Sequence, residues 1–287
     1  MDSWAAVLAA GSALGCAVLA CGSPVAGVQP ANVVEQQAAL MGKAAKWKKL
    51  EGERLLREGP ASPRRTGGQS PQPTILLIRH GETDGNSTGT IQVAETRLNA
   101  KGVEQARLLA ARLAPYPLSR LLTSDLARAL MTAEAIAEKA TVELELEPEL
   151  AERNFGDWRG VKYADLRLQG VSVMGADTAP PNGETWGVFH KRVEGVWGRM
   201  TTLAAKESLP VVLVCHGLTA RSILSRQVEC PEAKITGKGA LSVGNTSLTV
   251  IVMGEDGVWR TALTNCTKHL EGEEAARELG AKAVVGI

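Results

Sequence analysis

Two of the four histidines follow short apolar segments that have the composition of buried strands. His80 follows residues 75–78 and is preceded by Arg79, while His216 follows residues 211–214. Because open α/β sheets bind ligands outside the carboxyl ends of their strands, we expect both imidazoles at one edge of one sheet. A glycine comes after each histidine and lets the backbone turn sharply toward a ligand. One such histidine is ordinarily structural, but two in matched positions beside an arginine favour a functional site.

Arg128 adds a basic group at the start of a predicted helix. Ser124, four residues earlier, has the residue type of an N-cap, so Arg128 is expected in the first turn. Free backbone N–H groups and the helix dipole favour a bound anion there. The residues alone leave a second interpretation open, namely a surface arginine paired with Glu134.

The strands that must position these groups are visible as apolar patterns. Continuous apolar residues at 75–78 and 211–214 indicate strands buried on both faces. Alternation at 142–146 indicates a strand with one solvated face, near a sheet edge. The other predicted strands cover residues 118–122, 247–253 and 258–264, of which the last two should form an antiparallel hairpin.

Helices are predicted between these strands, beginning after residues suited to capping. Asn99, Ser124 and Thr185 each precede apolar residues spaced three or four apart. Helices that alternate with buried strands predict an α/β fold, a three-layer α/β/α sandwich with a mostly parallel sheet.

The composition excludes several classes of protein. Thirty-two Lys and Arg against 31 Asp and Glu give a net charge of +1, so the basic excess of a nucleic-acid-binding protein is missing. The five cysteines form no C-x-x-C pair and no regular framework, which indicates a reducing compartment. No H-E-x-x-H pattern occurs, so we expect no metal and no organic cofactor.

The first part of the chain differs in kind from the rest. Residues 3–34 contain no charged side chain and suit a targeting segment or a weak membrane anchor. Residues 35–59 are basic, and residues 60–73 have the composition of a Pro/Gly linker. If the hydrophobic segment spans a membrane, the positive residues after it place the body of the protein in the cytoplasm. An extension without a role in the chemistry is the other interpretation.

The residues around His80 resemble a known family. Residues 79–86 read R-H-G-E-T-D-G-N, similar to the R-H-G-E-T-x-x-N signature of the histidine phosphatase superfamily, the phosphoglycerate mutase-like group. Further blocks follow in the expected order: G-V-E-Q-A at 102–106, T-S-D-L-A-R-A at 123–129, E-R-N-F-G-D-W-R-G at 152–160, G-E-T at 183–185 and H-G at 216–217. The resemblance implies a phosphoglycerate mutase-like fold.

The resemblance also implies roles for individual residues. It makes His80 a nucleophile that becomes phosphorylated, and Glu152 a general acid that later acts as a base. It assigns phosphoryl binding to Arg79, Arg128 and His216, and places Asn86 beside them. A phosphomonoester carries about two negative charges at neutral pH, which suits two arginines and a helix N-terminus. His80 must be neutral to attack, and we expect the neighbouring cations to lower its pKa.

The resemblance divides the chain into three parts. Residues 1–73 are predicted to be an N-terminal extension, residues 74–270 a histidine phosphatase catalytic domain, and residues 271–287 a tail that is expected to be helical. No partner other than a small phosphorylated substrate is implied, apart from membrane association through the first part. The oligomeric state stays open.

Hydrolysis of a small phosphorylated metabolite is the predicted function, with phosphoglycerate mutase-type transfer as the alternative. Mutases of this family resemble one another in a long basic insertion after the E-R-x-x-G block, whereas residues 161–182 contain only Lys162 and Arg167 as basic residues. A short lid admits water, which favours hydrolysis. A second alternative is a membrane-anchored binding or signalling protein that uses the phosphatase fold. Specificity is expected to depend on residues 87–97 and 161–185.

Overall fold

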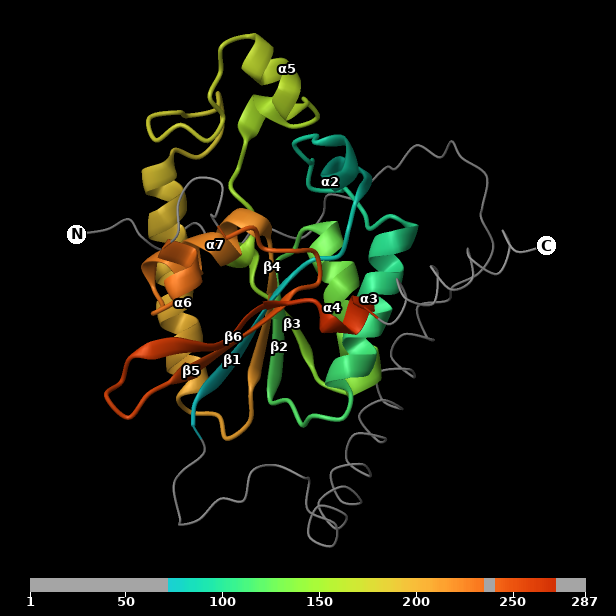
Figure 1. The fold of residues 1–287 in the computed structure, drawn as a ribbon, viewed down its shortest axis with the longest axis vertical. Coiled ribbons are helices and arrows are strands. Elements are labelled where there is room, and N and C mark those ends of the chain that lie inside the picture. The colour runs from blue at the N-terminus through green and yellow to red at the C-terminus, as the bar shows by residue number, and fades with distance from the viewer. Residues whose placement is uncertain (1–71, 235–240, 272–287) are drawn as a thin grey trace, which may run out of the picture. The chain divides into compact units, whose positions relative to one another are not determined.

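A six-stranded sheet lies between two layers of helices in the computed structural model, which describes residues 72–234 and 241–271 (Figure 1). The strands are β1 (Thr74–Arg79), β2 (Arg120–Thr123), β3 (Leu144–Leu146), β4 (Val211–Cys215), β5 (Leu248–Met253) and β6 (Trp259–Cys266). Their order across the sheet is β3-β2-β4-β1-β5-β6. The predicted three-layer α/β/α sandwich is confirmed.

The sheet is mixed, and its parallel part contains β1 and β4, the two strands that precede His80 and His216. β3, β2, β4 and β1 pair in parallel, whereas β5 is antiparallel to β1 and to β6. The mostly parallel sheet, the C-terminal hairpin and the position of β3 at an edge are therefore confirmed. β2 begins at Arg120, two residues later than predicted, because the chain still bends at Ser119.

Alternate residues of β1 enter two separate apolar cores. Ile75 and Leu77 pack with the helices on one face of the sheet, while Leu76 and Ile78 pack with those on the other. All four side chains are at most 7% exposed. A strand buried on both faces cannot shift its register without moving apolar groups between the cores, so the position of His80 at its end is fixed.

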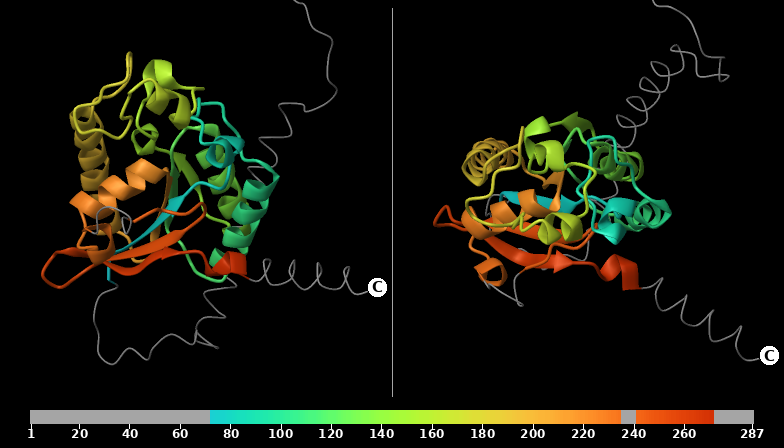
Figure 2. Two further views of the ribbon diagram at one scale, coloured as in Figure 1. Left: turned by 45° about the horizontal axis from the view of Figure 1, so that its top comes forward. Right: turned by 90° about the horizontal axis from the view of Figure 1, so that it is seen from above.

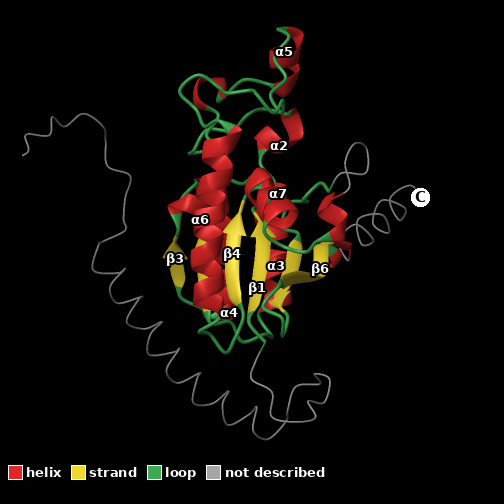
Figure 3. Cartoon of the chain, turned by 90° about the vertical axis from the view of Figure 1, so that its left-hand side faces the viewer, coloured by secondary structure: helices red, strands yellow, loops and turns green. Residues whose placement is uncertain are grey.

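Each face of the sheet is covered by a pair of helices. α3 (Ala100–Leu113) and α4 (Ala127–Ala140) contribute to the core on one face, and α6 (Trp186–Ala204) and α7 (Gly217–Arg226) to the core on the other (Figure 3). The short helices α2 (Asp84–Thr88) and α5 (Tyr163–Leu168) lie beyond the carboxyl ends of β1 and β4 (Figure 2). The two short helices are joined by the Tyr163 N–H, which donates to the Gly89 carbonyl at 2.9 Å.

Two of the three predicted N-caps are confirmed and one is wrong. The side chains of Asn99 and Thr185 accept hydrogen bonds from the N–H groups of Gly102 and Val188. Ser124 does not cap α4, which begins at Ala127 with Leu126 as its N-cap. The chain bends at residues 125 and 126 before the helix, and the Ser124 hydroxyl accepts from the Leu126 N–H at 3.2 Å and lies 2.9 Å from Nε2 of His216. Arg128 nevertheless lies in the first turn of α4, as predicted.

The N-terminal extension up to residue 71 and the tail from residue 272 onward lie outside the described residues. The targeting or anchoring segment, the basic segment, most of the linker and the helical tail therefore stay predictions. Within residues 72–234 and 241–271, no helix is long and apolar enough to cross a membrane.

Candidate active site

His80 is buried at the carboxyl end of β1 with one ring nitrogen already engaged. Its Nδ1 lies 2.7 Å from the carbonyl oxygen of Gly81, and the side chain is 2% exposed. A carbonyl can only accept a hydrogen bond, so Nδ1 carries the hydrogen and Nε2 keeps its lone pair. Burial, and after it the charges of Arg128 and Arg79, holds the pKa of His80 well below its usual value. The expected neutral imidazole is present, although burial contributes more to it than the cations do.

His216 ends β4 beside His80 but does not line the cavity. The two ring centroids are 5.1 Å apart, and Nε2 of His216 lies 2.9 Å from the hydroxyl of Ser124. Burial is the main cause that lowers the pKa of His216, followed by the charge of Arg128. Its Nδ1 is buried without a hydrogen-bond partner in the described part of the chain. The structure therefore places His216 next to the nucleophile candidate, in the wall behind the cavity surface.

Arg79 and Arg128 are held by single hydrogen bonds to backbone carbonyls. Nη1 of Arg79 donates to Val243 at 2.6 Å, and Nη1 of Arg128 donates to Val93 at 3.1 Å. Each Nε is buried without a partner among the described residues. Buried donors without partners are suited to an anion, since leaving them unsatisfied is unfavourable.

Arg128 is not the surface arginine of the alternative interpretation. Its side chain is 3% exposed and makes no ion pair with Glu134 among the described contacts. Burial, against the opposing effect of the Glu152 charge, lowers the pKa of Arg128 to about 10. Burial likewise lowers the pKa of Arg79. Both groups remain charged at neutral pH and are poorly solvated, which strengthens their attraction for an anion.

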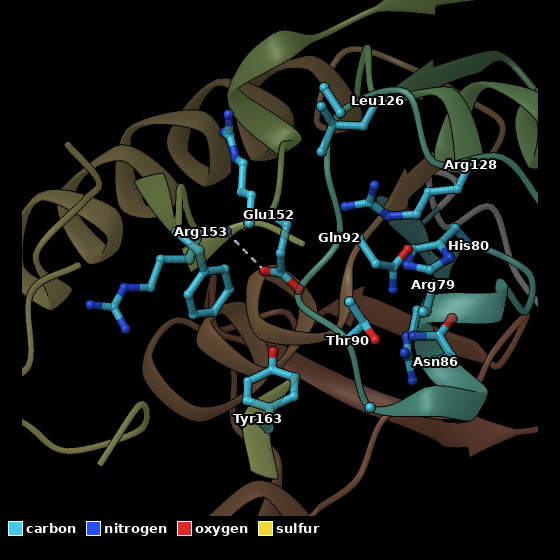
Figure 4. Close-up of a pocket in the computed structure, with 15 residues that line it drawn as sticks. Arg79, His80, Asn86, Thr90, Gln92, Leu126, Arg128, Glu152, Arg153 and Tyr163 are labelled. Carbon is cyan, nitrogen blue, oxygen red and sulfur yellow. Dashed lines mark hydrogen bonds between the residues drawn. The ribbon is translucent and has the colours of Figure 1, made fainter. Parts of the chain in front are cut away.

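Glu152 faces His80 from the opposite side of the cavity (Figure 4). Its Oε1 accepts from the Arg153 N–H at 3.0 Å, and its Oε2 accepts from the Leu218 N–H, in the first turn of α7, also at 3.0 Å. Two backbone donors from different segments thus fix the direction of the carboxyl group.

Asn86 completes the side of the cavity nearest β1. Its Oδ1 accepts from the Thr83 N–H and from the side-chain amide of Asn245, both at 3.2 Å. The same Asn245 amide lies 3.0 Å from the His80 carbonyl. Asn86 is therefore tied to the backbone that presents the histidine.

These groups surround a cavity of about 200 Å³. Five of the six predicted site residues line it, and His216 does not. The segments predicted to control specificity contribute Gly89, Thr90, Gln92, Ala94 and Tyr163. The remaining lining residues are Gly85, Leu126, Arg153, Phe155 and Arg159. The cavity has the size and the cationic lining for a phosphoryl group attached to a small organic group.

Two glycines allow the loop after His80 to pack directly on α3. A Cβ on Gly81 would lie 2.6 Å from the Gly102 carbonyl oxygen, and a Cβ on Gly102 would lie 2.0 Å from that of Glu82. Backbone meets backbone at this contact, so neither position has room for a side chain. Glu82 is a salt-bridge partner, with one carboxylate oxygen 2.8 Å from Nζ of Lys101.

Sequence reasoning missed several supporting residues. Thr132 Oγ1 accepts from the Gly81 N–H at 3.0 Å, from a position within α4. Asn245 gave no signal, because it lies in the loop before β5, where only a hairpin was predicted. Tyr163 points its hydroxyl toward Glu152 (Figure 4), and burial followed by the Glu152 charge raises its pKa to about 12. Among the described residues, no three His, Cys, Asp or Glu side chains gather closely enough to hold a metal ion.

The sheet topology and the cavity together define an α/β enzyme of phosphoryl chemistry. A family model described as histidine phosphatase superfamily (branch 1) matches residues 75–267, and the chain belongs to this superfamily. Its members act through a phosphorylated histidine as phosphatases or mutases.

Individual relatives include both kinds of enzyme. The chain is 31% identical over 200 residues to the adenosylcobalamin/alpha-ribazole phosphatase of Salmonella typhimurium, a match that covers 65% of this chain and 98% of the relative. A mycobacterial glucosyl-3-phosphoglycerate phosphatase in complex with VO3 superposes with a TM-score of 0.58 and 26% identity, over 67% of this chain and 99% of that one. A phosphoglycerate mutase from Bacillus anthracis gives a TM-score of 0.59 and 26% identity, over 70% and 96%. The phosphatase relatives support a phosphatase.

Proposed function

We propose that the chain hydrolyses small phosphomonoesters through a phosphohistidine formed on His80. The observation that carries the proposal is one cavity in which a neutral imidazole, two buried guanidinium groups and a carboxyl group face one another. Nucleophile, charge stabilisation and proton donor are the three requirements of this reaction.

Phosphorylation of the protein is the first half of the reaction. Arg79 and Arg128 bind the phosphoryl oxygens, and Nε2 of His80 attacks the phosphorus. The bond between phosphorus and the ester oxygen breaks as the N–P bond forms, and Glu152 donates its proton to the departing oxygen. Phosphoryl transfer has little other covalent chemistry, so positioning and charge stabilisation by the arginines supply most of the acceleration.

Hydrolysis of the phosphohistidine is the second half. Glu152, now a carboxylate, accepts a proton from a water molecule that attacks the phosphorus. The N–P bond breaks, inorganic phosphate leaves, and the lone pair returns to Nε2 of His80. A general acid or base of this kind contributes about 10²- to 10⁴-fold.

The lid segment favours hydrolysis over mutase-type transfer. Its two basic residues, Lys162 and Arg167, do not line the cavity, so they provide no second binding group for a phosphorylated intermediate. This segment thus adds no basic group that would retain a phosphorylated intermediate, which favours attack by water.

Release of phosphate from p-nitrophenyl phosphate tests the proposal. We expect His80→Ala to abolish turnover while the protein stays folded. His190→Ala is the matched control, since this histidine bonds Ser222 and does not line the cavity. Turnover by His80→Ala protein would contradict the mechanism, and isomerisation of 3-phosphoglycerate faster than its hydrolysis would favour the mutase.

A further inference from the structure

The backbone around Glu152 is held by one arginine of α6. Arg192 makes five hydrogen bonds, one for each N–H of its guanidinium group. Nε and Nη2 bind the two carboxylate oxygens of Glu184 at 2.8 and 2.9 Å. Nη1 donates to the carbonyls of Glu149 at 2.6 Å and Ala151 at 3.0 Å, and Nη2 donates to that of Glu152 at 3.3 Å. The arginine thus links three backbone carbonyls within residues 149–152 to the carboxylate of Glu184.

Glu184 extends the same connection past Glu152. Its Oε2 accepts from the Asn154 N–H at 2.8 Å, and its own N–H donates to the Asn154 carbonyl at 2.8 Å. Burial alone would raise the pKa of Glu184, but hydrogen bonds from Arg192 and the Asn154 N–H outweigh it and lower the pKa. The ion pair therefore persists through the neutral range and holds the chain on both sides of Glu152.

The direction of the Glu152 carboxyl group depends on this backbone. Among the described residues, both of its hydrogen bonds come from backbone N–H groups, those of Arg153 and Leu218. One of these donors belongs to the segment that Arg192 and Glu184 hold. A small displacement of that segment rotates the carboxyl group away from the departing oxygen, and misplacement by about 1 Å costs on the order of 10²-fold in rate.

We propose that Arg192, together with Glu184, is a positioning residue that aims the general acid Glu152 at the leaving group. The proposal rests on the function assigned to Glu152 above. Arg192 does not line the cavity, so it acts on the reaction through the residues that it holds, of which Glu152 is the one in the chemical step.

A lysine cannot take over this task. Its ammonium group is a point charge with three donors, whereas the five planar donors of arginine reach a carboxylate and three carbonyls at once. Arg192→Lys therefore keeps the charge and loses most of the geometry. It serves as a second variant beside Arg192→Met, and Glu184→Gln as a third that alters the opposite end of the connection.

The experiment compares two substrates of similar shape whose leaving groups differ in basicity, p-nitrophenyl phosphate and phenyl phosphate. Phenolate needs a proton when it departs, and p-nitrophenolate needs one much less. The measured quantity is kcat/KM, which reports the step that forms the phosphohistidine. We expect Arg192→Met and Arg192→Lys to lower kcat/KM for phenyl phosphate about tenfold more than for p-nitrophenyl phosphate, a fraction of the general-acid contribution.

Glu152→Gln separates failure of this proposal from failure of the proposed function. If Glu152→Gln lowers kcat/KM by the same factor for both substrates, Glu152 is not the general acid and the proposed mechanism fails. If Glu152→Gln is selective against phenyl phosphate and the Arg192 variants are not, the positioning role alone is refuted. If the Arg192 variants lower kcat/KM equally for both substrates, Arg192 has only a structural role and the proposal is refuted.

Arg199→Met is the matched control on the same helix. Arg199 pairs with the carboxylates of Glu147 and Glu149, so it contacts the same segment, but it donates to none of its backbone carbonyls. We expect its ratio of the two kcat/KM values to equal that of the wild type. If Arg192→Met does not fold, Arg192→Lys and Glu184→Gln decide the question, because both keep polar groups at these positions.

Discussion

Replacing Arg128 with methionine removes one of the two guanidinium groups that bind the phosphoryl oxygens in the proposed mechanism. Two unit charges about 4 Å apart interact by about 4 kcal/mol at an effective dielectric constant of 20. Since about 1.36 kcal/mol corresponds to a factor of ten in rate, kcat/KM for p-nitrophenyl phosphate should fall about 10³-fold. Methionine keeps most of the buried length of the side chain, so the loss reflects the charge.

The same substitution should stabilise the free protein. The pKa of Arg128 is about 10, roughly two and a half units below the ordinary value, because burial disfavours its charged form. Each unit corresponds to about 1.36 kcal/mol, so the charge costs the folded state about 3 kcal/mol at any pH below about 10. Loss of the hydrogen bond to Val93 offsets about 1 kcal/mol of this gain. A net gain of about 2 kcal/mol corresponds to a Tm increase of several degrees.

Steady-state kinetics and thermal unfolding without ligand measure the two effects. Arg159→Met is the control, because Arg159 also lines the cavity but is exposed, so solvent screens its charge and both effects should be small. A fall in both activity and Tm for Arg128→Met would refute the reasoning, since it would show that the charge contributes to the fold. Unchanged kcat/KM would remove Arg128 from the phosphoryl site.

Two further predictions concern the buried histidines. Ser124→Ala leaves Nε2 of His216 without its partner and should lower both the free energy of unfolding, by about 1–3 kcal/mol, and kcat/KM. Ser222→Ala breaks a similar contact with His190 and should leave kcat/KM unchanged; equal kinetic effects of the two would contradict the assignment. The free energy of unfolding should decline as the pH falls below about 6.5. His80 and His216 become protonated there in the unfolded chain, whereas burial keeps them neutral in the folded protein. Thermal unfolding between about pH 5 and 8 measures this trend, and a Tm that rises on acidification would exclude it.

Local signals account for what the sequence predicts well. The caps Asn99 and Thr185 bond N–H groups three residues later, so their evidence lies within one turn of helix. β1 and β4 are short apolar runs whose burial on both faces follows from their composition alone. The site residues Arg79 and His80 follow because they are adjacent to such a strand.

Contacts between distant segments account for what the sequence does not predict. Ser124 has the residue type of a cap, but its hydroxyl bonds the Leu126 N–H ahead of the helix and also contacts His216, 92 residues away, so the helix begins later than predicted. Asn245 reaches the His80 carbonyl from 165 residues away, through a loop whose own sequence has no catalytic pattern. The two strand ends at His80 and His216 look alike in sequence, yet only His80 lines the cavity. A sequence pattern places a ring at an edge of the sheet without determining which way the ring turns.

The carbonyl of Gly81 determines which isomer of phosphohistidine the proposed reaction produces. It occupies Nδ1 of His80 at 2.7 Å, so phosphorus can bond only to Nε2, which makes the product the tele isomer rather than the pros isomer. The bond is a phosphoramidate, which cleaves readily once acid protonates its nitrogen. An alkaline quench therefore preserves the phosphohistidine, whereas an acid quench hydrolyses the N–P bond and removes the phosphoryl group before it can be detected.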